Sequence, residues 1–249
     1  MNSPITRGSV HHFDQELSAL KEKLITMGGL AEAAVRRSMK ALVDRDDANA
    51  RNAKQEDELL DELEMAIDDM AITLLAKAPL ASDLRLVTVA MKISHNLERV
   101  GDEATTIARR ALEVNTEPQL KPYVDIPKMA DLALEMLKEA LDAFVTRDPA
   151  RARAVVPRDK EVDALNKQLH RELASYMIEQ PPTITRALNL MVISKAIERI
   201  ADHAANIAEE VVYVYEGRDI RHGGQGKARP SKTGTRSSNH RSAPPLPAP

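Results

Sequence analysis

Two pairs of carboxylates stand out because each pair is spaced by four residues and the same pattern occurs twice. Glu98 and Asp102 form the first pair, and Glu198 and Asp202 form the second. Acidic residues on a helix usually belong to a solvated face. Like charges at i and i+4 repel, however, by roughly a few tenths of a kcal/mol. The recurrence of this unfavourable spacing favours a cation site over a plain solvated face.

A second set of aspartates repeats with the same spacing and could add ligands to such a site. Asp57 and Asp61 precede the first pair, and Asp159 and Asp163 precede the second. Aspartates near a helix start are also favoured by the helix dipole, which explains Asp57 and Asp159 without a metal. Oxygen ligands of this kind suit iron, manganese or magnesium, and a nearby imidazole would also allow zinc.

The direction of these side chains follows from the apolar residues on the same helices. Apolar residues that step by four and three form two seams: Ile93, Leu97, Val100, Ala104 and Ile107, and Ile193, Ile197, Ile200, Ala204, Ile207 and Val211. At about 100° per residue, both Glu-x-x-x-Asp pairs lie roughly 130–170° from the seam centre. We therefore predict that both pairs point away from the core. The aspartates of the second set lie on the flank of their own seams, where they can approach a neighbouring helix.

The elements that would hold these residues are six long helices. We predict them at residues 12–44, 46–77, 82–114, 128–147, 149–179 and 184–216, with Asp46 and Asp148 as helix caps. The stretch from Asn115 to Pro127 contains three prolines and is typical of a linker. The fold class is therefore all-α.

The second half of the chain repeats the first, so the six helices form one three-helix unit used twice. The segment 41–46 aligns with 143–148 at an offset of 102 residues. After a two-residue length change, 91–94 aligns with 191–194 and 98–102 with 198–202. Nearby residues differ between the halves, such as His95 against Lys195 and Glu103 against His203. A repeat of this length predicts two pseudo-symmetric three-helix bundles.

We place the first repeat at residues 10–116, the second at 123–222, and a disordered tail at 223–249. The tail is rich in Gly, Ser, Pro and Arg and offers nothing that can bury a core. From Arg218 onward seven basic residues face Asp219 alone, so the preceding body carries a formal charge of −9. An acidic body argues against nucleic acid as the main partner. The basic tail leaves an anionic membrane or nucleic acid as a weaker idea.

Composition excludes several classes of site. The 249-residue chain has no cysteine, which rules out disulfides, thiolate zinc sites and iron–sulfur clusters. No basic-then-apolar leader and no long uncharged apolar run is present, so we expect a cytoplasmic protein that meets membranes only through partners. We also find no Gly-rich phosphate loop, nucleophile elbow or Glu-x-x-His pair, although His203 beside Asp202 could assist a metal. We therefore expect a protein that is not an enzyme.

At these residues the chain closely resembles the PhoU family, the accessory regulators of phosphate-specific transport. The resemblance covers about residues 10–222 and rests on an ordered set of segments: 26–29, 81–87, both Glu-Arg-x-x-Asp motifs, 159–163 and 217–222. Two positions depart from the family pattern. The Gly before the motif Asp is kept as Gly101 but is Ala201 in the second repeat, and the Asn kept as Asn206 is Thr106 in the first.

The resemblance implies surface metal clusters at Glu98, Asp102, Glu198 and Asp202, with Asp61 and Asp163 as weaker additions. Iron is the first expectation for the metal, with zinc, manganese or magnesium as alternatives. It also implies a homodimer or larger assembly. Its expected role is a negative regulator of the phosphate regulon and a modulator of high-affinity phosphate uptake. In that role it would link the ATPase subunit of the phosphate ABC transporter to a sensor histidine kinase. The alternative is a metalloenzyme that uses the carboxylate clusters.

Overall fold

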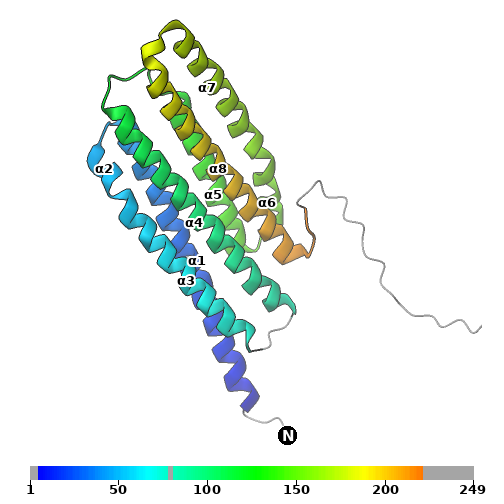
Figure 1. The fold of residues 1–249 in the computed structure, drawn as a ribbon. Coiled ribbons are helices and arrows are strands. Elements are labelled where there is room, and N and C mark those ends of the chain that lie inside the picture. The colour runs from blue at the N-terminus through cyan, green and yellow to red at the C-terminus, as the bar shows by residue number, and fades with distance from the viewer. Residues whose placement is uncertain (1–4, 78–80, 221–249) are drawn as a thin grey trace, which may run out of the picture.

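The computed structural model describes residues 5–77 and 81–220, and within these ranges every regular element is a helix (Figure 1). The α-helices are α1 (Ile5–Val43), α2 (Asp47–Arg51), α3 (Ala53–Leu75), α4 (Ala81–Asn115), α5 (Asp125–Thr146), α6 (Pro149–Val155), α7 (Asp159–Glu179) and α8 (Ile184–Glu216). Two short 3-10 turns, η1 (Val156–Arg158) and η2 (Pro181–Thr183), lie on either side of α7. The all-α class and the six long helices are confirmed. The predicted tail at 223–249 lies outside the described residues.

The second helix of each repeat differs from the prediction because it is broken into a short and a long piece. The helix predicted at 46–77 is interrupted at Asn52, between α2 and α3. The helix predicted at 149–179 is interrupted by η1, which contains Pro157. Proline lacks the backbone N–H and its ring clashes with the preceding turn, so the α-helix cannot pass through it. The first helix also begins earlier than predicted, at Ile5.

Both repeats make the same turn between their first and second helices, which supports the duplication in three dimensions. Arg45 and Arg147 both adopt a left-handed backbone with φ 56°, although neither is glycine. In each turn the next backbone N–H donates to a carbonyl five residues earlier, from Asp46 to Ala41 and from Asp148 to Ala143. The side chains of Asp46 and Asp148 then cap α2 and α6 as predicted.

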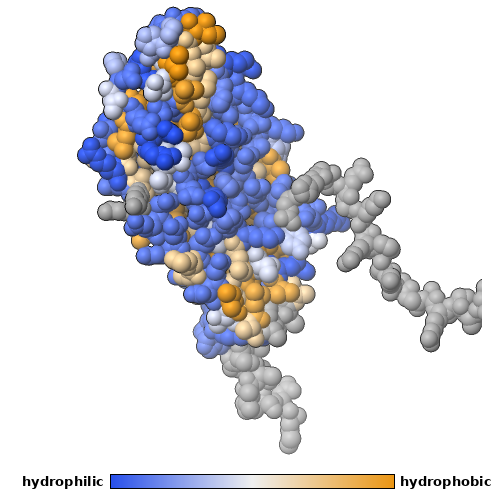
Figure 2. All heavy atoms as spheres, in the orientation of Figure 1, coloured by the Kyte–Doolittle hydropathy of each residue, from blue (hydrophilic) through white to orange (hydrophobic). Residues whose placement is uncertain are grey.

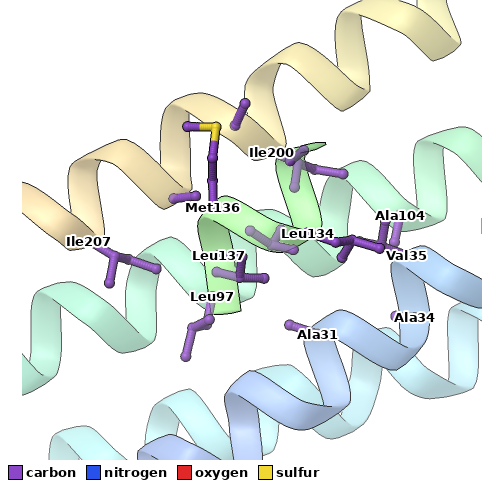
Figure 3. Close-up of a cluster of buried hydrophobic side chains, with 14 of the residues drawn as sticks. Ala31, Ala34, Val35, Leu97, Ala104, Leu134, Met136, Leu137, Ile200 and Ile207 are labelled. Atoms are coloured by element: carbon purple, nitrogen blue, oxygen red, sulfur yellow. The ribbon is translucent and has the colours of Figure 1, made fainter. Parts of the chain in front are cut away.

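The core runs continuously through both repeats. Helices α4 and α8 lie side by side at the centre, α1 and α3 pack on α4, and α5 and α7 pack on α8 (Figure 1). Small and aliphatic side chains fill the space between α1, α4, α5 and α8 (Figure 3): Ala31, Ala34, Val35, Leu97, Ala104, Leu134, Met136, Leu137, Ile200 and Ile207. Gly28 marks a close approach, because a Cβ there would lie 2.5 Å from Leu141 Cδ1. Such packing makes the two repeats one rigid frame for α4 and α8.

No helix in the described ranges is both long and apolar enough to cross a bilayer. The longest helices instead bury one face and leave the other polar. On α4 the buried face carries the predicted seam from Ile93 to Ile107, all of whose members are at most 1% exposed.

Candidate metal centre

In the first repeat, α3 and α4 bring the predicted acidic residues together. Glu98 lies near Asp102 on its own helix and near Asp61 and Glu64 on α3, as their electrostatic influence on its pKa indicates. Asp57 likewise lies near Asp102 and Asp61. We refer to these residues, with His95, as the first cluster. The prediction that the aspartates beside the α3 seam approach the next helix is thus met in this repeat.

A mixed nitrogen and oxygen donor set lies at the edge of the first cluster. One ligand atom each from Glu64, His95 and Glu98 can be chosen so that all three lie within 4.8 Å of one another. His95 Nδ1 lies 3.1 Å from Glu64 Oε1. Three ligands of this kind can hold a divalent ion and leave further coordination positions open.

Electrostatics in the first cluster oppose the ionisation of Glu98. Burial is the main cause and the Asp102 carboxylate adds to it, and together they raise the pKa of Glu98 to about 7. Arg99 works in the other direction, with Nε 3.4 Å from Glu98 Oε2 and Nη1 3.1 Å from Asp102 Oδ2. The same Glu98 Oε2 atom is buried and has no hydrogen-bond partner. The cluster therefore holds more negative charge than its arginine offsets.

The second repeat brings its acidic residues together in the same way, between α7 and α8. Burial raises the pKa of Asp159 to about 6, and the nearby carboxylates of Asp202, Asp163 and Glu198 contribute. One oxygen of Asp159, Oδ1, is buried and lacks a hydrogen-bond partner. We refer to Asp159, Asp163, Glu198 and Asp202 as the second cluster.

Two lysines distinguish the second cluster from the first. Lys195, at the position of His95, forms an ion pair with Glu198. Lys167 Nζ lies 3.2 Å from Asp163 Oδ2. At the position of Glu64 the second repeat has Asn166, whose Oδ1 accepts a hydrogen bond of 2.8 Å from Ser194. The second cluster thus contains its own cations and lacks the mixed donor set.

The predicted orientation of the Glu-x-x-x-Asp pairs was wrong for the two glutamates. Glu198 is buried, with 7% exposure, and the side chain of Glu98 is only 14% exposed. Each glutamate faces the second long helix of its repeat rather than open solvent. Only the aspartates keep the predicted exposure, since Asp102 has a side chain 44% exposed and Asp202 is exposed.

His203, which could assist a metal beside Asp202, has one ring nitrogen in contact with a residue outside the second cluster. Its Nδ1 lies 3.0 Å from Asn96 Oδ1 on α4, across the contact between the repeats. Burial lowers the pKa of His203, so a neutral ring is favoured despite the Asp202 carboxylate nearby. The contact joins α4 and α8.

Sequence reasoning missed Glu64 and His95. Comparison of the repeats had marked His95 against Lys195 only as a divergent surface position. The signal that could have found it is the spacing His95-x-x-Glu98, since residues at i and i+3 share a helix face. Glu64 offered no comparable signal, because its approach to His95 depends on how α3 packs on α4.

The residues of the first cluster fit a divalent metal. The unpartnered Glu98 oxygen needs a donor or a cation, and the charge of the cluster is not balanced from within. The imidazole of His95 together with carboxylates suits zinc, iron or manganese better than magnesium, which prefers oxygen ligands and water. The second cluster fits a metal less well because Lys195 and Lys167 already neutralise part of its negative charge.

Comparison with known proteins finds a family whose model matches this chain. The model of a family described as the PhoU domain matches the chain twice, at residues 24–111 and 126–211. A Pseudomonas aeruginosa relative, the phosphate-specific transport system accessory protein PhoU homolog, is 40% identical over 218 residues, covering 85% of this chain and 90% of the relative. A Rhizobium meliloti protein of the same name is 42% identical over 207 residues, with coverage of 82% and 87%.

Two solved structures resemble the fold closely. The crystal structure of PhoU from Pseudomonas aeruginosa has a TM-score of 0.80 at 40% identity and covers 82% of this chain and 99% of its own. The structure of the phosphate transport system regulatory protein PhoU from Streptococcus pneumoniae has a TM-score of 0.79 at 30% identity, with coverage of 84% and 99%.

Proposed function

The chain belongs to the PhoU family, and from that premise we propose that it acts as a non-enzymatic adaptor that restrains the phosphate regulon and modulates phosphate uptake. It would contact the ATPase subunit of the phosphate ABC transporter and a sensor histidine kinase on the cytoplasmic side, and hold the kinase inactive when phosphate is plentiful. The observation that carries this proposal is the double match to the PhoU domain, together with relatives named as accessory proteins of phosphate transport.

The shape of the molecule supports binding rather than catalysis. Its grooves are shallow channels between helices, and the chemistry-bearing side chains lie along helix faces rather than at the floor of a closed pocket. The long helical faces of α3, α4, α7 and α8 provide extended surfaces of the kind that protein partners use. A dimer or larger assembly of this chain is part of the proposal.

In this role a metal would shape a docking surface. Glu64, His95 and Glu98 would hold the ion in the first cluster, with Asp61 and Asp102 close by. When bound, the ion neutralises carboxylates that otherwise repel each other, and its open positions can accept a partner's carboxylate or phosphate oxygen. Iron, zinc and manganese all match the donor set.

Deletion of the gene provides the direct test of the regulatory role. We expect a deletion strain grown in phosphate-rich medium to express phosphate-starvation genes at a high level, measured with a reporter for a phosphate-controlled promoter. A plasmid copy of the wild-type chain should restore repression. Normal repression in the deletion strain would contradict the proposal.

Affinity purification from phosphate-replete cells tests the adaptor role and its dependence on the clusters. We expect the wild-type chain to recover the transporter ATPase and a sensor kinase. A variant with Glu98→Gln, Asp102→Asn, Glu198→Gln and Asp202→Asn should lose bound metal and recover less of both partners. The matched control, Asp14→Asn with Glu22→Gln, Asp131→Asn and Glu179→Gln, removes four exposed carboxylates outside the clusters and should behave as the wild type. Failure of the wild type to recover either partner, even after cross-linking, would count against the adaptor role.

The first cluster also favours one second candidate, a metalloenzyme. A metal held by Glu64, His95 and Glu98 would have open positions, where it could polarise a bound water or a phosphoester oxygen. Metal-dependent hydrolysis of a phosphoester substrate that disappears in Glu98→Gln would support this alternative. Equal, trace activity in both proteins would dismiss it.

A further inference from the structure

Two equivalent grooves flank the central helices α4 and α8, and their charges are opposite. The groove beside the first repeat has a volume of about 480 Å³ and includes Asp68 and Glu210 in its lining. The groove beside the second repeat has a volume of about 630 Å³, and the equivalent residues there are His170 and Arg110. We call these the acidic groove and the basic groove. The two repeats therefore have a groove at the same place, but the charge of its lining differs.

The charge inversion extends beyond the groove lining. Asp69 on α3 corresponds to Arg171 on α7, and the pair Glu209 and Glu210 near the end of α8 corresponds to Arg109 and Arg110 near the end of α4. Lys195 adds a further positive charge to the basic groove, with a side chain 46% exposed. Within the chain, Arg110 Nη1 lies 2.9 Å from Glu113 Oε2, and Lys195 pairs with Glu198. Arg109 and Arg171 are exposed, so four basic side chains stand against these two carboxylates. In a molecule with an acidic body, this face has an excess of basic groups.

The basic groove also exposes aliphatic side chains in a helical stripe. Ile184, Leu188 and Val192 follow one another at intervals of four along α8 and are 42%, 50% and 37% exposed. Leu188 and Val192 line the groove itself. Figure 2 shows apolar atoms gathered in a band at the upper end of the molecule, where α7 and α8 lie side by side in Figure 1. Burial of each such side chain under a partner would favour binding, because apolar surface is removed from water.

In the acidic groove, the positions equivalent to Leu188 and Val192 carry polar residues that make contacts within the chain. Val192 and Leu188 correspond to Lys92 and Thr88 in the first repeat. Lys92 Nζ lies 3.1 Å from both carboxylate oxygens of Glu210 and 5.6 Å from the ring centroid of Tyr213, so it spans from α4 to α8. Valine at position 192 can make no such contact, which leaves the basic groove open and apolar.

We propose that the basic groove is a docking site for an amphipathic helix of a partner protein, one that carries an aliphatic ridge flanked by carboxylates. The ridge would pack against Leu188 and Val192, and its carboxylates would meet Lys195 and Arg110. A helix suits the site because its side-chain ridge can lie in the channel that residues of α4, α7 and α8 line. This inference rests on the adaptor function, since it specifies the surface through which one partner is bound.

A second copy of this chain is a less suitable occupant. The strongly acidic helix α3, which belongs to the other repeat, exposes the apolar residues Leu59, Met65 and Ile72. Contact between that face and the basic groove would be head-to-tail, so each added copy leaves both kinds of face open for another. A single helix from another protein saturates the groove without such growth.

A binding experiment with defined peptides tests the chemistry of the groove. The probe is a fluorescein-labelled helical peptide with leucines along one face and glutamates beside them, compared with the same peptide carrying lysines in place of the glutamates. We expect the full chain to bind the glutamate peptide at least tenfold more tightly, by fluorescence anisotropy. Leu188→Thr with Val192→Thr, which removes the aliphatic surface without adding a charge, should weaken that binding at least tenfold. The matched control Met65→Gln with Ile72→Thr should leave it unchanged. Equal affinity for both peptides, or unchanged affinity of the groove variant, would overturn the proposal.

Photo-crosslinking in phosphate-replete cells identifies the natural occupant. With a photoreactive amino acid at position 192, we expect a crosslink to a partner helix whose aliphatic residues are flanked by acidic ones, mapped by mass spectrometry. A crosslink to another copy of this chain, to lipid, or to no molecule would contradict the proposal.

The outcomes separate this proposal from the adaptor function. If the wild type and the groove variant recover the transporter ATPase and the kinase equally, the adaptor function is supported. The groove is then not the surface through which these partners bind. Recovery of neither partner by the wild type would remove the adaptor function, and selective binding of the glutamate peptide would then still support the groove as a docking site.

Discussion

The two repeats have similar backbones and equivalent pairs of acidic residues, but the negative charge of these residues is neutralised to different degrees. In the first repeat Glu98 has a pKa near 7 and an oxygen without a hydrogen-bond partner. In the second repeat Lys195 forms an ion pair with the equivalent Glu198, which lies buried. An ammonium group within the chain thus takes the place that a bound cation would take in the first repeat. The first cluster thus has a nitrogen and oxygen donor set, whereas the second keeps an unpartnered oxygen on Asp159 but is partly neutralised by its lysines.

The neighbouring grooves diverge in the same sense. The acidic groove shares Glu64 and His95 with the first cluster, so cation binding there would alter the lining of that groove. The basic groove shares Lys195 with the second cluster. Each cluster therefore adjoins a different surface, the first one polar and acidic, the second one basic and apolar. This division of roles is what the following substitutions are designed to break.

The largest effect is expected when the lysine of the second repeat is placed in the first. His95→Lys removes a nitrogen ligand and adds a positive charge beside Glu64 and Glu98, so divalent metal should bind at least about 100-fold more weakly. Isothermal titration with zinc and manganese measures the affinity. His95→Gln separates loss of the ligand from gain of the charge and should bind metal with intermediate affinity. Metal binding that is unaffected by His95→Lys would show that the ion is held elsewhere.

The next effect concerns stability without metal. Glu98 has a folded pKa of about 7 against an ordinary value of 4.5, so the folded state holds an extra proton between these values. Ionisation of Glu98 therefore costs stability progressively as pH rises from about 4.5 to 7, and the full cost remains above 7. Glu98→Gln should raise the free energy of unfolding by about 2 kcal/mol at pH 8, after allowance for solvent screening, and should change nothing below pH 4.5.

The control for that measurement is the equivalent change in the second repeat. Glu198→Gln removes the carboxylate that Lys195 pairs with, and we expect it to lower the free energy of unfolding by about 1 kcal/mol. Urea unfolding in the presence of a chelator measures both variants. Equal and same-signed effects of the two substitutions would refute the difference between the clusters.

The reciprocal graft should give the second repeat a metal site of its own. Asn166→Glu with Lys195→His reproduces the Glu64 and His95 donors beside Glu198. We expect this variant to bind one additional divalent ion, with an affinity within about tenfold of the first site, because outer contacts of the ligands also tune affinity. Titration stoichiometry checks the result, and Lys195→Met serves as a variant that removes the charge without adding a ligand. An unchanged stoichiometry in the graft would mean that the donor set is insufficient.

The fold could be predicted from sequence much further than the site. The six long helices followed from apolar seams, and the caps at Asp46 and Asp148 followed from their residue type. An apolar seam shows on which side of its own helix a side chain lies, but not which other helices cover that side. It could not show that α3 and α7 cover the glutamates, so Glu98 and Glu198 were placed too far into solvent. The contact between Glu64 and His95 depends on packing between two helices and was missed for the same reason.

Gly101 and Ala201 provide the finest test, because they are equivalent positions beside the two clusters. A Cβ on Gly101 would lie 2.4 Å from Leu60 Cδ1 and 3.4 Å from Asp57 Oδ1. The second repeat has the opposite combination, with the larger Ala201 and the smaller Val162 at the position of Leu60. Both pairs thus hold a similar total volume at the contact between the two helices.

Gly101→Ala alone should lower the free energy of unfolding by about 1 kcal/mol, because overpacking against buried Leu60 exceeds the gain in helix propensity. Gly101→Ala with Leu60→Val copies the second repeat and should recover most of that loss, which urea unfolding in a double-mutant cycle can measure. The displaced Asp57 should also weaken metal binding in the single variant and less in the double. If Gly101→Ala alone stabilises the chain by the full propensity gain of about 1 kcal/mol, then α3 and α4 are not held at this distance by the glycine, and the first cluster does not depend on it.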